Sequence, residues 1–116
     1  MNSMVLRMVD ANFTIYVVDD DDFVRDALRA LLKSEGYKVQ VFESAQAFLS
    51  WRHHQREGVL VLDVRMPGMN GLELQRHLAG SGVVIPIIFI SAHDDIRTRE
   101  KAMAAGAVAF MQKPFE

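Results

Sequence analysis

Short apolar segments alternate with amphipathic ones along most of the chain. Five of these segments are rich in Val, Ile and Phe and are too short for a long helix, which is typical of buried strands. We therefore predict strands at 13–19, 37–42, 59–63, 85–91 and 108–113.

The stretches between the predicted strands repeat apolar residues at the spacing of amphipathic helices. The last of them has only a thin apolar stripe, with Ile96, Met103 and several alanines, so we expect it to pack loosely. Asp21 is expected to face solvent. The predicted helices cover 23–35, a stretch after Ser44, 71–79 and a stretch ending at Ala105, with N-caps at Asp22, Ser44 and Asp94 or Asp95 and stops at Gly36 and Gly106.

Strands that alternate with helices predict a parallel sheet with helices on both faces. The segments 13–19, 59–63 and 85–91 are apolar almost throughout, as expected for strands buried on both faces. The segment 37–42 alternates apolar and polar residues and suits an edge strand. A length of 116 residues fits one domain.

The last predicted strand, 108–113, raises the question of what covers it. A sheet of this type normally ends with a helix packed over its last strand, and no such helix follows in this chain. We expect residues 1–12 to form an N-terminal leader and 13–116 to form a domain that lacks this final helix. We hypothesise that the leader, or a second chain, partly covers the open face.

Composition excludes several classes of function. The net charge is −2 and the basic residues are scattered, so we expect no direct nucleic-acid binding by this chain. The absence of cysteine rules out a disulfide framework and a thiolate metal site, which fits a cytoplasmic protein. No apolar run is long enough to cross a membrane, and the first residues do not form a signal peptide.

The strand ends carry the candidate chemistry, because ligands of open α/β sheets bind at the carboxyl ends of the strands. There the predicted strands deliver Asp19, Asp20, Asp63, Ser91 and Lys113. Carboxylates that lie close together repel one another and favour a cation, and an all-oxygen donor set is typical of Mg²⁺. Asp63 could then attack phosphorus, while Lys113 and Ser91 bind the phosphoryl oxygens.

Each of these residues also has an ordinary structural interpretation. An aspartate-rich turn commonly caps a helix, and Asp63 could simply open a loop rich in Pro and Gly. Ser91 could cap a turn, and Lys113 could be a solvated charge. Their shared position at one end of the predicted sheet favours a single site.

Four motifs occur in a characteristic order, namely "VVDDDD", "VLVLDVRMPGMNG", "IIFISAH" and "AGAVAFMQKPF". In them, and over nearly the whole chain from about Ile15, the sequence resembles the receiver domains of bacterial two-component response regulators. The segments "DVRMPGMNGLEL" and "ISAHDD" are most similar to receivers of transcriptional regulators with a C-terminal helix-turn-helix. The resemblance implies a flavodoxin-like, doubly wound, five-stranded parallel sheet with strand order 2-1-3-4-5.

The resemblance also implies a role for each residue of the acidic site. Asp63 is expected to be the phosphoacceptor and a metal ligand. Asp20 is expected to bind Mg²⁺ directly and Asp19 through a metal-bound water, with the backbone carbonyl of Arg65 as a further ligand. Mn²⁺ could substitute for Mg²⁺.

The response to phosphorylation is implied in the same way. Ser91 and Lys113 would bind phosphoryl oxygens, and Phe110 stands at the aromatic switch position. The bond before Pro114 would be cis. The side chains of Arg65 and His93 occupy positions that tune the lifetime of the phosphoryl group, although both could equally be solvated loop residues.

The function implied is that of a phosphorelay receiver rather than an enzyme. A sensor histidine kinase or a phosphotransfer protein would phosphorylate Asp63, and an output domain outside this chain would control transcription. A homodimer is a further expected assembly. Two alternatives stay open, an adaptor that works without phosphorylation and an Asp-nucleophile phosphatase, although no loop here is long enough for the insertion that caps a phosphatase's substrate.

Overall fold

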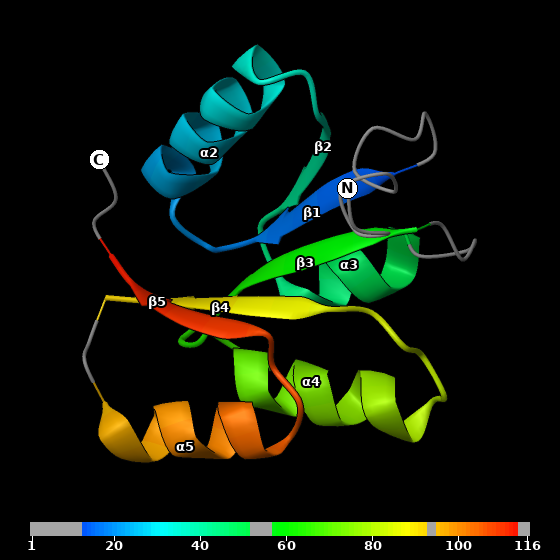
Figure 1. Cartoon of the computed structure of the whole chain (residues 1–116), viewed down its shortest axis with the longest axis vertical. Helices are drawn as coiled ribbons and strands as arrows, with labels where there is room; N and C mark the ends of the chain where they lie inside the picture. The colour runs from blue at the N-terminus through cyan, green and yellow to red at the C-terminus, as the bar shows by residue number, and fades with distance from the viewer. Residues whose placement is uncertain (1–12, 52–56, 93–94, 114–116) are drawn as a thin grey trace, which may run out of the picture.

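A five-stranded parallel sheet forms the centre of the computed structural model, which describes residues 13–51, 57–92 and 95–113 (Figure 1). The strand order is β2-β1-β3-β4-β5, as the sequence resemblance implied. The predicted strands are confirmed, with ends that differ by one or two residues. They are β1 (Thr14–Val18), β2 (Lys38–Phe42), β3 (Gly58–Asp63), β4 (Ile87–Ser91) and β5 (Ala109–Gln112).

Helices cover the two faces of the sheet unequally (Figure 1). One helix packs on the first face, and the other three pack on the second, where most of the buried apolar side chains lie. The helices are α2 (Asp22–Ser34) on the first face and α3 (Ala45–Trp51), α4 (Gly71–Gly80) and α5 (Ile96–Ala104) on the second.

The helix caps correct one prediction. Asp21, not Asp22, is the N-cap of α2, because the Asp21 side chain accepts a hydrogen bond from the Phe23 amide at 2.8 Å. Asp22 is the first helical residue and pairs with Arg25. Sequence alone could not choose between adjacent aspartates, because each can cap a helix and the choice depends on where the chain leaves β1.

The other predicted caps agree with the structure. The hydroxyl of Ser44 accepts from the Ala47 amide at 3.0 Å, and the carboxylate of Asp95 accepts from the first amides of α5. Asp94 lies outside the described residues. Asn70, which the sequence did not single out, forms a capping box with Glu73 at the start of α4.

The expectation that α5 packs loosely is confirmed, but the residue that attaches it was not foreseen. Ala102 is the one buried residue of α5, whereas Ile96 and Met103 are 65% and 42% exposed. The apolar stripe read from the sequence therefore faces largely outward. The buried side chain of Gln75 on α4 adds a hydrogen bond, because its Nε2 donates to the Ala102 carbonyl at 3.1 Å.

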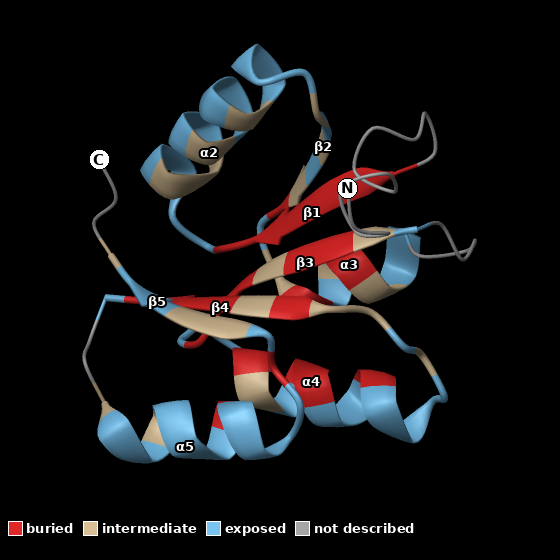
Figure 2. Ribbon diagram, in the orientation of Figure 1, coloured by how far each residue is buried: buried red, intermediate tan, exposed pale blue. Residues whose placement is uncertain are grey.

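The first face of the sheet stays partly exposed beside α2, whose residues are coloured as intermediate or exposed in Figure 2. No residue of α2 is fully buried, and Leu31 is about half exposed. Val61 and Ile88 are only partly buried, and Met111 on β5 is 49% exposed. What covers this face stays a prediction, because residues 1–12 lie outside the described part of the chain.

Candidate functional site

The carboxyl ends of the strands bring the predicted site residues together. Asp19 directly follows β1, Asp63 and Ser91 end β3 and β4, and Lys113 follows β5. Carboxylate oxygens of Asp19, Asp20 and Asp63 all lie within 4.8 Å of one another. Parallel strands place their ends on one edge of the sheet, so residues far apart in sequence form one cluster.

Asp19 is held by its backbone and by its side chain. Its amide donates to the Phe42 carbonyl of β2 at 3.1 Å, and its Oδ1 accepts from the Asp21 amide at 2.9 Å. Its Oδ2 is fully buried and pairs with the Lys113 ammonium at 2.7 Å. A carboxylate oxygen has two lone pairs, so Oδ2 can accept a further partner beside Lys113.

Lys113 supplies the positive charge that faces the cluster. Its Nζ lies 2.7 Å from Asp19 Oδ2 and 3.3 Å from Asp63 Oδ1. Burial of the ammonium opposes its charged form, but the two carboxylates outweigh this effect and raise the pKa of Lys113 above its usual value. The Lys113 amide donates to the Ser91 carbonyl at 2.6 Å, which fixes the start of the side chain.

Asp63 is buried and carries an unusual proton affinity. Burial of its carboxyl, followed by the charge of Asp19, raises the pKa of Asp63 from 3.8 to about 7, although Lys113 acts in the opposite direction. A hydrogen bond with the Asp20 side chain also raises the pKa. Without a bound cation, the site therefore favours the protonated form of Asp63 far more than water favours that of a free aspartate.

Gly71 lets α4 approach the end of β3. A Cβ atom at this position would lie 2.3 Å from the Asp63 carbonyl oxygen, so only glycine fits there. The Gly71 amide donates to the Val64 carbonyl at 2.9 Å, which ties the helix start to the loop after Asp63. Sequence reasoning placed Gly71 at the helix start but did not identify this contact.

Ser91 and Phe110, the predicted switch pair, lie on the neighbouring strands β4 and β5. Ser91 is buried at the end of β4. Phe110 lies on β5, half-buried, with its ring 6.2 Å from the Phe89 ring. The guanidinium of Arg99 on α5 lies 5.4 Å from the centre of the Phe110 ring, so this ring contacts both the core and α5.

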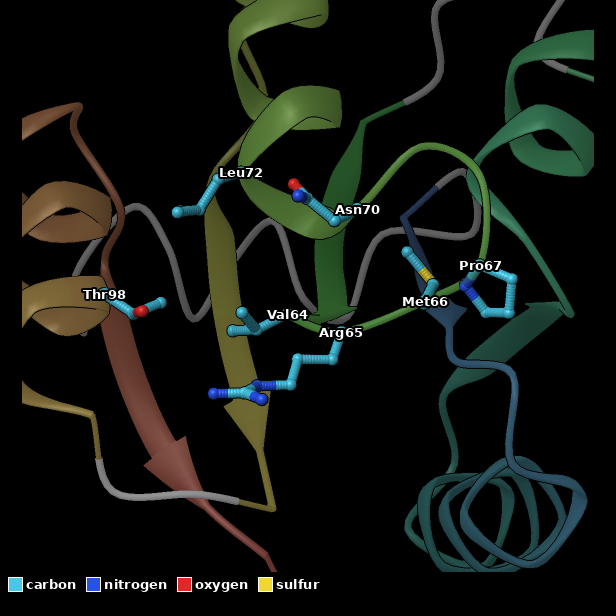
Figure 3. Close-up of a pocket in the computed structure, with 7 residues that line it drawn as sticks. All are labelled: Val64, Arg65, Met66, Pro67, Asn70, Leu72 and Thr98. Atoms are coloured by element: carbon cyan, nitrogen blue, oxygen red, sulfur yellow. The ribbon is translucent and has the colours of Figure 1, made fainter.

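An open cavity of about 520 Å³ lies next to the loop that follows β3 (Figure 3). It is lined by the loop after Asp63 and by Thr98 of α5, and the acidic residues do not contribute to its wall. The Arg65 side chain is exposed and extends from this loop along the cavity (Figure 3). Its charge contributes to a lowered pKa of Asp95, behind the larger effect of the Thr98 hydroxyl.

The residues present fit a hard divalent cation. Three carboxylates face one ammonium group, which leaves the cluster with excess negative charge if all are ionised. The donor atoms are all oxygens, and the carboxylates of Asp19 and Asp63 are buried where only the Lys113 ammonium offsets their charge. Carboxylate oxygens in this number are the ligands that Mg²⁺ prefers in proteins. His93 and Pro114 lie outside the described residues.

Comparison with known proteins identifies the class of this site. The family model of the response regulator receiver domain matches residues 15–116. The chain therefore belongs to the response regulator receiver domain family, and it is a signalling receiver rather than a classical enzyme. No helix in the described part of the chain is long and apolar enough to cross a membrane.

Individual relatives extend this assignment. The response regulator protein TmoT of Ectopseudomonas mendocina is 52% identical over 109 residues, covering 94% of this chain and 50% of that protein. The transcriptional regulatory protein FixJ of Rhizobium meliloti (strain 1021) is 45% identical over 105 residues, covering 90% and 52%. The chain thus spans about half the length of these curated relatives.

Solved structures confirm the flavodoxin-like fold. The response regulator StyR superposes with a TM-score of 0.85 and 52% identity, over 91% of this chain and 54% of that one. The structure named FixJ-N superposes with a TM-score of 0.83 and 44% identity, over 92% and 86%. The sequence resemblance to receiver domains is therefore confirmed at the level of fold and family.

Proposed function

We propose that Asp63 accepts a phosphoryl group from a phosphohistidine on a sensor histidine kinase or a phosphotransfer protein. The observation that carries this proposal is the placement of the Asp63 carboxylate between two further carboxylates and the ammonium of Lys113, 3.3 Å away. A lone buried carboxylate would be protonated and inert, whereas this arrangement can hold a cation and the oxygens of a phosphoryl group.

The transfer forms one bond and breaks one bond. An Asp63 carboxylate oxygen attacks phosphorus, and the phosphorus–nitrogen bond of the donor breaks, so that the imidazole leaves with the electron pair. Lys113, whose Nζ lies 3.3 Å from Asp63 Oδ1, would pair with one phosphoryl oxygen, and the buried Ser91 would donate to another. Bound Mg²⁺ would offset the charge on the carboxylates and the transferring group.

The residues proposed to hold Mg²⁺ are Asp19, Asp20, Asp63 and the Arg65 backbone carbonyl, and Mn²⁺ would occupy the same positions. The all-oxygen cluster supports this assignment. We also propose that Arg65 and His93 tune the phosphoryl lifetime. The cis bond before Pro114 remains a prediction.

The proposed switch runs from the phosphoryl group to α5. When Ser91 moves toward a phosphoryl oxygen, the space that it leaves can admit the Phe110 ring. Phe110 contacts Arg99 on α5, and α5 is attached by little buried surface, so a moved ring changes the surface of α5 and β5 at small cost.

We further propose that the receiver controls transcription in the cytoplasm through a domain outside this chain, and that it works as a homodimer. The name of FixJ as a transcriptional regulatory protein supports the first point. We propose 13–116 as the receiver unit, with 1–12 as a leader, and a further segment or chain over the open sheet face near Met111.

Intact mass measurement tests the proposed phosphorylation directly. The protein is incubated with a small acyl phosphate and Mg²⁺, and a single phosphoryl adduct is expected. The adduct should be lost in Asp63→Asn and kept in Asp26→Asn, a matched change at an exposed position of α2. No adduct at any Mg²⁺ concentration would indicate an adaptor, and repeated turnover of a phosphoester would indicate an enzyme.

A further inference from the structure

Arg25 is a partly buried cation beside the acidic cluster that the proposed phosphoryl transfer does not use. It lies in the first part of α2, and its side chain is only 15% exposed. Its backbone amide donates to the carbonyl of the N-cap residue Asp21 at 3.1 Å, so the helix start fixes its position. Long helical side chains point back toward the helix N-terminus, which directs this guanidinium to the turn after β1.

The guanidinium binds the backbone of the turn rather than its metal-binding carboxylates. Arg25 Nη1 donates to the Asp19 carbonyl oxygen at 2.7 Å, and Nη2 pairs with the exposed Asp22 carboxylate. A second cation in direct contact with the acidic cluster would compete with a metal ion. A contact to the carbonyl avoids that competition and leaves the carboxylates of Asp19 and Asp20 available.

The Asp19 carbonyl belongs to the peptide unit that joins Asp19 to Asp20. This unit is planar, so fixing its oxygen restricts rotation of the plane and determines where Asp20 begins. The other polar groups of Asp19 are already held by Phe42, Asp21 and Lys113. Asp20 is exposed, yet one of its carboxylate oxygens lies within 4.8 Å of oxygens of Asp19 and Asp63, so its position depends on how its backbone is held against their repulsion.

We propose that Arg25 is a positioning residue of the Mg²⁺ site: by holding the Asp19 carbonyl, it fixes the Asp19–Asp20 peptide and keeps the Asp20 carboxylate beside Asp63. This inference rests on the proposed metal site. Partners that orient metal ligands from outside the first coordination sphere typically change metal affinity by about 10- to 100-fold.

Magnesium titration of the full chain, followed by backbone amide NMR, tests the proposal. Arg25→Met should weaken Mg²⁺ affinity about tenfold. Before any Mg²⁺ is added, the same variant should also shift the carbonyl resonance of Asp19 and the amide resonance of Asp20, because the hydrogen bond is lost. Arg25→Gln, which is too short to keep both contacts, provides a second variant if Arg25→Met does not fold.

Two control variants separate positioning from general stability. Asp22→Asn removes the exposed ion pair but keeps the bond to the carbonyl, so its Mg²⁺ affinity should stay within about threefold of wild type. Ala30→Gly weakens α2 at an exposed position away from the turn, and its affinity should be unchanged. A loss in Ala30→Gly equal to that in Arg25→Met would overturn the proposal.

Asp20→Asn distinguishes failure of this inference from failure of the metal site. If Asp20→Asn loses Mg²⁺ affinity while the folded Arg25 variants bind as wild type does, the positioning role is overturned and the metal site stands. If the wild-type chain binds no Mg²⁺, both proposals fail together.

Discussion

At the scale of single residues, the ionisation of Asp63 is coupled to the binding of a cation. Its carboxyl is buried against Asp19, so the ionised form is unfavourable and the pKa rises to about 7. Asp63 must be ionised to bind a cation or to attack phosphorus, yet burial and the charge of Asp19 make its ionised form unfavourable. A cation relieves this repulsion, which links metal binding, protonation and stability at one side chain.

The first prediction concerns the stability of the metal-free protein. Between about pH 4 and pH 7 the folded state keeps a proton on Asp63 that the unfolded chain has released, so stability falls as pH rises through this window. Asp63→Asn mimics the protonated form. In EDTA at pH 8 it should be more stable than wild type by on the order of 2 kcal/mol, measured by urea unfolding, with a smaller gain at pH 5.

Asp26→Asn serves as the control, because its side chain is exposed and should change stability little at either pH. A wild-type protein more stable than Asp63→Asn at pH 8 would contradict the prediction.

A second prediction follows for magnesium affinity. A proton on Asp63 competes with the metal, so the apparent affinity should rise up to about tenfold per pH unit as pH rises toward 7 and then level off. Titrations at several pH values measure this dependence. Asp63→Asn should bind more weakly and with a flatter pH profile; an equally steep profile in this variant would assign the proton to another group.

At the scale of elements, the close approach of α4 to β3 determines where Asp63 sits. Gly71 begins α4 and its Cα faces the Asp63 carbonyl with no room for a side chain. The capping box of Asn70 and Glu73 orients the same helix start. The loop that carries the proposed Arg65 carbonyl ligand is therefore anchored at both of its ends.

Gly71→Ala tests this anchoring. The new methyl group would push α4 away from β3, and overpacking of this kind typically costs about 1–3 kcal/mol, measured by thermal or urea unfolding. Gly80→Ala, at the other end of the same helix, meets open space and should be neutral or stabilise the protein by up to about 1 kcal/mol. Equal effects of the two substitutions would show that the close contact is unimportant.

The sequence was informative about elements to different degrees. The strand ends could be predicted because apolar runs stop at charged residues, and their convergence follows from parallel topology. The caps of α2 and the inner face of α5 could not, because Asp21 and Asp22 have equal capping ability and Ala102 gives no stronger signal than Met103. The role of Arg25 was missed for a similar reason, since a helical arginine after aspartates ordinarily predicts only a surface ion pair.

At the scale of the whole molecule, the two faces of the sheet contribute unequal cores. The side covered by α3, α4 and α5 holds the larger cluster, including the aromatic group of Tyr16, Phe42, Phe48 and Trp51. The side covered by α2 holds a smaller cluster of buried residues, and several apolar side chains packed against it are only partly buried. Most of the stability therefore resides on the face opposite α2.

Two phenylalanine substitutions test this inequality. Phe48 is fully buried on α3, and Phe48→Ala should lower the free energy of unfolding by about 3–5 kcal/mol. Phe23 on α2 is 87% exposed, and Phe23→Ala should change the free energy of unfolding by no more than about 0.5 kcal/mol. Urea unfolding of both variants gives the comparison, and a similar loss in the two would indicate that Phe23 is covered in solution.

The thin attachment of α5 has a consequence for the time course of amide hydrogen exchange. A helix with one buried residue, held also by the Gln75 hydrogen bond and the Arg99–Phe110 contact, can open without disturbing the centre of the sheet. Its amides should exchange with deuterium in minutes under conditions in which those of β1 and β3 remain protected for hours. Fluctuations of the resting protein would then already visit alternative arrangements of α5, and a signal at Asp63 would need only to select among them.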